Sequence, residues 1–319
     1  MDLTLRNSRG RKLFKRLVGQ NNHFLITILV GLDSVEQGAA ALSEDFHTSW
    51  SPKDVQASSR RSREFAIKAT LIWICDALDA YLRTGTEHPC LFSPKLMGEL
   101  ADARQQDRTS ISDRLQIVAK NAGAYGTNAY HLAQVAIVWR NRVTHYRAKN
   151  RVAQADVAAL TKNAESIRNE YQGLDVVRII DHANKKEPEA PTFKEITSLL
   201  RAVHCLFEEI DKSLIGTLDM DDYLEQVVAE YVRSEDIADD AKRPAVRARR
   251  IHNIWGKQDA TKVSGRDHIY PSRRVGAVWQ VALNGGMTET LGGEPHRTTA
   301  AKVAELAAMD PVQAAKLFS

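Results

Sequence analysis

Apolar residues recur three and four positions apart over most of the first two thirds of the chain. This spacing is typical of amphipathic helices, and the alternation of apolar and polar residues that strands require is nearly absent. The pattern predicts helices near residues 23–42, 53–84, 109–121, 127–147, 153–172 and 193–215. The predicted fold class is therefore all-α, with a helical bundle over residues 23–217.

The helix over residues 53–84 is expected to form the centre of this bundle. Between residues 65 and 82 it is apolar on most of its circumference, so that neighbouring helices can cover it on several sides. Ser51 and Pro52 fit its N-cap and first turn, and Gly85 fits its end.

Both ends of the chain differ from the bundle in charge. Residues 1–22 are predicted to form a basic N-terminal arm, with a frayed basic helix as the alternative. The cations of this segment are Arg6, Arg9, Arg11, Lys12, Lys15 and Arg16. After residue 218 an acidic block over 219–240 is followed by a basic block over 242–274. This change predicts a domain boundary and a smaller, mainly helical C-terminal accessory region over residues 218–319.

The composition is that of an ordinary globular protein. Of 319 residues, 43% are hydrophobic and 26% are charged, and the formal net charge is +4. Three cysteines without a CxxC spacing argue against a disulfide framework and a structural zinc site, and no other metal-ligand motif is present. No apolar run is long enough to cross a membrane and no nucleotide-binding glycine loop is found, so we expect a cytoplasmic protein without a cofactor.

Chemically distinctive residues gather where the helix predicted over residues 127–147 ends. Its apolar face leads into Arg140, Asn141 and His145, with further cations between and after them. Asn141 and His145, four positions apart, share a helix face, whereas Arg140 and His145 differ by about 140°. These side chains line one cleft if it is wide or if the helix distorts.

An arginine, an adjacent asparagine and a histidine after four intervening residues resemble the motif of the HEPN (higher eukaryotes and prokaryotes nucleotide-binding) domain family. The resemblance implies an all-α bundle that pairs as a homodimer, with both copies of the motif lining one cleft. It also implies a metal-independent endoribonuclease of a toxin–antitoxin, abortive-infection or antiviral defence system, with Arg140, Asn141 and His145 as catalytic residues. Some members carry a modifiable tyrosine two positions after the histidine. Here Tyr146 follows His145 directly and Arg147 holds that place, which departs from the pattern for adenylylation.

The same residue types suit RNA cleavage on chemical grounds. The 2′-hydroxyl of RNA can attack the adjacent phosphorus, so that a protein need only move protons and stabilise the charge that develops. A histidine is suited to proton transfer near neutral pH, and an arginine remains charged and can bond two phosphate oxygens. The expected products are a 2′,3′-cyclic phosphate and a 5′-hydroxyl.

Other residues are predicted to support this cluster. Asp76, on a largely apolar helix, needs a partner, and is expected either to hold Arg140 or His145 or to pair with another cation of the bundle. Arg142 and Tyr146 are further supporting candidates within the motif. The predicted nucleic-acid contacts are Arg147, Lys242, Arg243, Arg247, Arg249 and Arg250. Folding of the basic block onto the preceding acidic block is the alternative for the last five.

The sequence thus predicts a metal-independent endoribonuclease that binds RNA, acts as a homodimer and does not associate with a membrane. The resemblance also allows an antitoxin or defence-system protein as a partner. One alternative is a non-catalytic HEPN-like module that holds RNA or a partner. A second is a DNA-binding regulator that acts through the C-terminal basic block.

Overall fold

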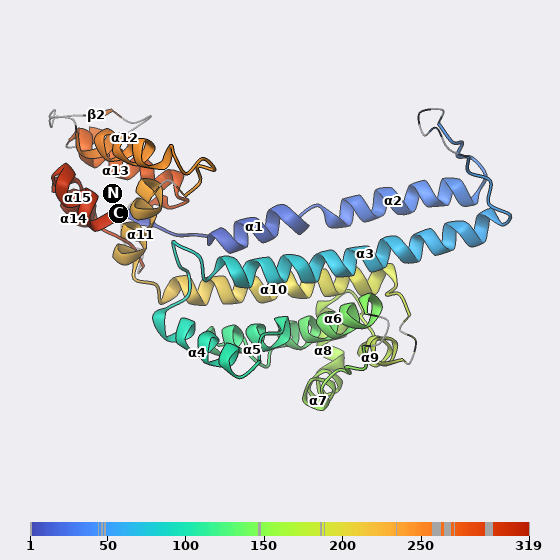
Figure 1. The fold of residues 1–319 in the computed structure, drawn as a ribbon. Coiled ribbons are helices and arrows are strands. Elements are labelled where there is room, and N and C mark those ends of the chain that lie inside the picture. The colour runs from blue at the N-terminus through green and yellow to red at the C-terminus, as the bar shows by residue number, and fades with distance from the viewer. Residues whose placement is uncertain are drawn as a thin grey trace. The chain divides into compact units, whose positions relative to one another are not determined.

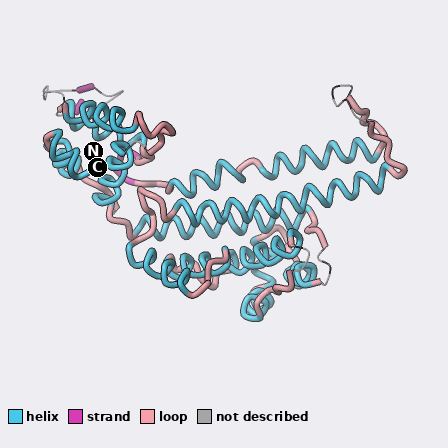
Figure 2. Tube along the Cα trace, in the orientation of Figure 1, coloured by secondary structure: helices cyan, strands magenta, loops and turns pink. Residues whose placement is uncertain are grey.

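A computed structural model gives the fold of the chain (Figures 1 and 2). It describes residues 2–43, 45, 47, 49–145, 148–185, 187, 189–233, 235–256, 263–264, 269–270, 272–290 and 296–318. Nearly all regular structure in these residues is helical, which confirms the predicted all-α class. The chain divides into two compact units, one of residues 10–82 and 99–210 and the other of residues 1–9, 83–98 and 211–319.

The helices and strands follow one another in this order: β1 (Asp2–Thr4), α1 (Arg9–Val18), α2 (Asn21–Glu36), α3 (Val55–Thr84), α4 (Pro94–Gln105), α5 (Ile111–Asn121), α6 (Asn128–Thr144), α7 (Gln154–Lys162), α8 (Ala164–Glu170), α9 (Val176–Asn184), α10 (Phe193–Gly216), α11 (Met220–Arg233), α12 (Arg243–Trp255), β2 (Val263–Ser264), β3 (Ile269–Tyr270), α13 (Arg273–Asn284), β4 (Thr288–Thr290), α14 (Ala300–Ala308) and α15 (Pro311–Phe318).

The unit of residues 10–82 and 99–210 is built around α3 and α10, which lie side by side (Figure 1). Tyr81 of α3 and Phe207 of α10 stack with ring centroids 4.0 Å apart, and Phe14 of α1 meets Phe207 edge to face at 4.8 Å. These rings are buried, and burying them supplies hydrophobic stabilisation where the three helices meet.

The helices α1 and α2 run along α3 on its other side (Figure 1). The Trp73 indole N–H donates to the Leu17 carbonyl at 2.8 Å, and the Ser59 hydroxyl donates to the Leu32 carbonyl at 2.8 Å. Because residue numbers fall along α3 as they rise along α2, these two bonds fix an antiparallel helical hairpin.

A layer formed by α5 to α9 completes this unit, and α6 is its most buried helix. Nearly every residue of α6 from Ala129 to Ile137 is buried, and Trp139 is fully buried. The helix α6 packs on α5, α7 and α9. It is therefore held on several sides before it reaches Arg140.

The other unit joins both ends of the chain. Strand β1 pairs antiparallel with β4, with Leu3 opposite Glu289, and Leu3 forms a further bridge to Thr298. The helices α11 to α15 pack against one another, and Trp255 of α12 stacks on Phe318 of α15 at 5.7 Å.

The observed element boundaries follow the sequence pattern within the bundle, except that α2 ends at Glu36 rather than near 42 and the helix predicted over 153–172 is divided into α7 and α8. Asp54 caps α3, since its carboxylate accepts from the Ala57 N–H at 2.9 Å, so the helix begins three residues beyond the predicted Ser51-Pro52 start. Gly85 follows the last residue of α3 as predicted. Residues 1–22 are not a separate arm, because β1 pairs with β4 and α1 packs along α3.

No helix of the described residues is both long enough and apolar enough to span a lipid bilayer.

Candidate functional site

The motif residues lie at the C-terminal end of α6. The Thr127 hydroxyl caps the start of this helix by accepting from the Tyr130 N–H at 3.2 Å. At the other end, the His145 N–H still donates to the Asn141 carbonyl at 3.0 Å, but the His145 backbone is extended, with φ −112° and ψ 104°. The helix therefore ends directly at His145, and the chain changes direction there.

Arg140 is held in place by two groups on two helices. Its Nη2 lies 2.7 Å from the Asp76 carboxylate of α3, and its Nη1 donates to the Asn141 side-chain oxygen at 3.1 Å. The Arg140 Nε is buried and has no hydrogen-bond partner in the part of the chain that the structure describes. Because the side chain is 20% exposed, its guanidinium is oriented by the protein and still reaches the surface.

Asp76 therefore pairs with Arg140, which is one of the two interpretations that the sequence left open for this carboxylate. Its side chain is 53% exposed, so water also solvates this carboxylate. Asp79, one turn further along α3, pairs with Arg114 of α5 instead. Two carboxylates of one helix thus hold arginines from two different helices.

His145 is exposed, and its imidazole makes no hydrogen bond or ion pair with another described residue in this structure. Arg140 and Asn141 are joined to each other, whereas His145 is linked to Asn141 through the backbone alone. The structure thus brings the guanidinium, the amide and the carboxylate together, and places the imidazole one helical turn away at the end of the same helix.

Arg142 points into the protein rather than toward this cluster. It is 8% exposed, and it donates from Nη1 to the Asn150 carbonyl at 3.1 Å and from Nη2 to the Lys185 carbonyl. It therefore ties two loops to the end of α6. Tyr146 and Arg147, the other predicted residues of this segment, lie outside the described residues.

Cys75, Cys205 and His204 lie in or near the core and offer no activated nucleophile. Burial raises the pKa of Cys75 to about 12, opposed by the nearby Arg140 charge and reinforced by that of Asp76. Burial likewise raises the pKa of Cys205 and lowers that of His204, whose ring packs against Phe14 at 4.8 Å. These groups therefore stay neutral near pH 7, as expected of core residues.

The predicted C-terminal basic block belongs to the other unit, and three of its described cations pair with the acidic block before it. Lys242 lies 3.0 Å from Asp239, and Arg243 lies 2.7 Å from Asp240. These contacts agree with the alternative interpretation, in which the basic block folds onto the acidic one.

Arg250 makes the most complete of these pairs. Its two terminal nitrogens bond Asp236 at 2.9 and 3.0 Å, and its guanidinium lies over the Tyr231 ring at 5.0 Å. The pairing lowers the pKa of Asp236. Arg247 and Arg249 are the two predicted cations of α12 for which the structure gives no carboxylate partner among the described residues.

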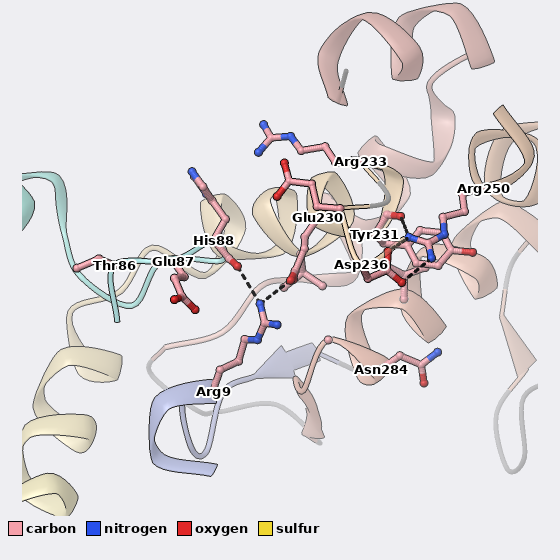
Figure 3. Close-up of a pocket in the computed structure, with 14 residues that line it drawn as sticks. Arg9, Thr86, Glu87, His88, Glu230, Tyr231, Arg233, Asp236, Arg250 and Asn284 are labelled. Carbon is pink, nitrogen blue, oxygen red and sulfur yellow. Dashed lines mark hydrogen bonds and ion pairs between the residues drawn. The ribbon is translucent and has the colours of Figure 1, made fainter. Parts of the chain in front are cut away.

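A pocket of about 580 Å³ lies within this same unit, and its lining comes from five separate segments of the chain (Figure 3). Arg9 sits between the His88 carbonyl at 2.8 Å and Glu230 at 2.7 Å, and Arg250 lies on the opposite wall with Asp236. Carboxylates and guanidiniums are mixed throughout, so the pocket has no net preference for anions. Sequence reasoning missed it because its walls are far apart in the chain.

Among the described residues, no group of three or more histidine, cysteine or acidic side chains is arranged to hold a metal ion. In comparisons with family models, curated proteins and solved structures, no match to this chain is found.

Proposed function

We propose that this protein is a metal-independent endoribonuclease that cleaves RNA at the end of α6 and acts as a homodimer. The observation that carries the proposal is the Arg140 guanidinium, oriented by Asp76 and Asn141 at the surface one turn from the exposed His145. A role in antiviral defence or in a toxin–antitoxin system follows from the resemblance of this motif to the HEPN family.

In the proposed reaction the RNA 2′-oxygen attacks the adjacent phosphorus, and the bond between that phosphorus and the 5′-oxygen breaks. His145 accepts the 2′-hydroxyl proton, water gives a proton to the departing 5′-oxygen, and the resulting hydroxide is reprotonated by the imidazolium. Arg140 is suited to stabilise the extra negative charge on the phosphorane oxygens. Because the nucleophile belongs to the substrate, no metal is needed to generate a hydroxide.

The direct test is cleavage of a single-stranded RNA in the presence of EDTA. We expect the wild-type protein to cut it and His145→Ala to be slower by about 100-fold or more, since a positioned acid–base group contributes about that much. Mass spectrometry of the products should show a 2′,3′-cyclic phosphate end. Cleavage by a folded His145→Ala protein at the wild-type rate would remove His145 from the mechanism.

Asp76 is expected to act as a positioning residue. Removing its carboxylate in Asp76→Ala frees the Arg140 fork, so kcat should fall about 10- to 100-fold with little change in KM. Asp76→Glu should restore part of the rate, because it keeps the charge opposite Arg140. Asp79→Ala is the matched control, since Asp79 holds Arg114. Equal losses in both alanine variants would point to a structural effect instead.

A further inference from the structure

The helix α2 carries more exposed apolar surface than a surface helix normally does. Phe24, Ile26, Ile28 and Val30 are 57%, 45%, 49% and 60% exposed, and Leu25 is the one apolar residue of α2 that is buried. Isolated exposed apolar residues are common, but four within seven positions form a patch that is typical of an interaction surface.

The neighbouring half of α3 continues this apolar surface. Phe65 is 75% exposed and Trp73 is 49% exposed, with the small residue Ala69 exposed between them. A groove of about 530 Å³ lies between the two helices and is lined mainly by apolar side chains from Leu17 to Leu32 and from Phe65 to Trp73. A projecting phenylalanine and an apolar groove thus lie on one face, which is what a self-complementary contact requires.

The exposed residues of α2 form two stripes rather than one. Phe24 and Ile28 line the groove, whereas Ile26 and Val30 lie about 200° further around the helix. The groove stripe continues onto Phe65, Ala69 and Trp73 of α3, so it forms one two-helix face that the hairpin leaves uncovered. A second helical hairpin presents a matching two-helix face and can cover it.

We propose that two copies of this protein pair through their α2–α3 hairpins to form an antiparallel four-helix bundle. This inference deepens the homodimer of the proposed function by naming its surface. Its first tests involve no RNA, so they can succeed or fail independently of the nuclease.

Charge along the hairpin favours the antiparallel arrangement. Lys15 and Arg16 are exposed cations at the end of α1, whereas near the end of α2 two carboxylates, Asp33 and Glu36, share the single guanidinium of Arg63. When the α1–α2 segments of two copies lie antiparallel, the basic end of each, at Lys15 and Arg16, lies beside the acidic end of the other. A parallel pair would place like charges together, which is unfavourable.

The helix α3 has a similar charge gradient. Arg60 and Arg61 lie near its start and are exposed, and the half-exposed Asp76 lies near its other end. Antiparallel pairing of two α3 helices therefore also brings opposite charges together.

We place the two-fold axis at the middle of the apolar face, near Leu25 of α2 and Ile67 of α3, which the bonds from Trp73 to Leu17 and from Ser59 to Leu32 hold at about the same level. The partner copy's Arg60 and Arg61 then come opposite residues 74 and 73, within one turn of Asp76. The two Asp76 residues are about 27 Å apart along the bundle. Each cleavage site combines the motif of one copy with the cations of the other, which differs from the cleft with two motifs that the HEPN resemblance implies.

Analytical ultracentrifugation of the full chain tests the association. We expect a wild-type dimer and a dissociation constant raised at least about tenfold in Phe65→Glu and in Ile28→Glu, both on the groove face, with helical circular dichroism unchanged. Val177→Glu is the matched control, because Val177 is 64% exposed but lies on α9. A monomeric wild-type protein, or one that instead binds anionic phospholipid vesicles through the same residues, would overturn the proposal.

Cysteine cross-linking tests the register. Phe24→Cys lies next to the two-fold axis and should cross-link to itself with a short bis-maleimide. Arg16→Cys and Ser34→Cys should each fail alone but cross-link when mixed. The wild-type protein, which keeps Cys75, Cys90 and Cys205, controls for the native thiols. Self-linking of Ser34→Cys with none in the mixture would indicate a parallel pair and contradict this register.

Mixing two slow variants tests whether each cleavage site uses residues of both copies. His145→Ala and the double variant Arg60→Glu/Arg61→Glu should each be slow, yet an equal mixture should regain about a quarter of the wild-type rate. Half of its dimers are mixed, and each mixed dimer contains one complete cleft. Absence of recovery from a mixture that forms mixed dimers would reject the shared cleft while leaving the dimer itself established.

Discussion

Arg140→Ala is expected to abolish RNA cleavage and leave the fold intact, whereas Arg142→Ala, two residues later, should destabilise the fold. The Arg140 partner Asp76 is 53% exposed and stays solvated when the guanidinium is removed, so the free energy of unfolding should change by about 1 kcal/mol or less. Arg142 is buried and donates to the Asn150 and Lys185 carbonyls, and its loss should cost about 2–3 kcal/mol. Chemical denaturation followed by circular dichroism measures both changes.

The rate of RNA cleavage is the second measurement that separates Arg140→Ala from Arg142→Ala. Loss of a positioned cation that stabilises the transition state should slow Arg140→Ala by about 100-fold or more at a temperature where it is fully folded. Arg140→Lys keeps the charge but loses the planar fork that reaches Asp76 and Asn141 together, so little of the rate should return. If Arg140→Ala cut RNA normally, the central proposal would fail, whatever its stability.

The sequence was sufficient to predict where most bundle helices lie, because their apolar spacing is strong. It did not predict α4 or α9, which are 12 and 9 residues long, and it gave a helix in the region of α1 only as an alternative to an arm. Their positions depend on tertiary packing, since short helices are marginal by themselves. For the same reason the pairing of β1 with β4, nearly three hundred residues apart, has no local signal.

The candidate site shows the same division between local and long-range information. The order of Arg140, Asn141 and His145 along α6 is a local property and was visible in the sequence. For Asp76 the sequence left two interpretations open, because it is 64 positions from Arg140 and has a second carboxylate, Asp79, one turn away. The structure decides between them by pairing Asp79 with Arg114.

The sequence-based prediction differs most from the structure at α3. Residues 65–82 of α3 are apolar on most sides, and the expectation was that the bundle would cover them. Phe65 and Trp73 are instead exposed, and so are Phe24, Ile26, Ile28 and Val30 of α2. An apolar pattern shows that a face is to be buried, but it does not show whether the covering helix comes from the same chain.

Trp139→Ala should be among the most destabilising single substitutions in the unit that carries the motif. The indole is fully buried, and its N–H donates to the Glu189 carbonyl at 2.9 Å across fifty residues of chain. Replacing a buried side chain of this size by alanine typically lowers the free energy of unfolding by about 3–5 kcal/mol, and the Glu189 carbonyl would also lose its donor. Urea unfolding should show the loss, and hydrogen exchange should place it in α6 and in the α9–α10 segment.

Two further substitutions make this prediction specific to the buried site. Trp139→Phe keeps most of the packing but removes the N–H, and should cost less than Trp139→Ala. Trp50→Ala, at an indole that is 42% exposed, should change the unfolding free energy by about 1 kcal/mol or less. Because Trp139 directly precedes Arg140, its loss should also slow cleavage by loosening the end of α6 that orients the guanidinium. Full activity in a destabilised Trp139→Ala protein would show that the site tolerates movement of this helix end, contrary to a preorganised Arg140.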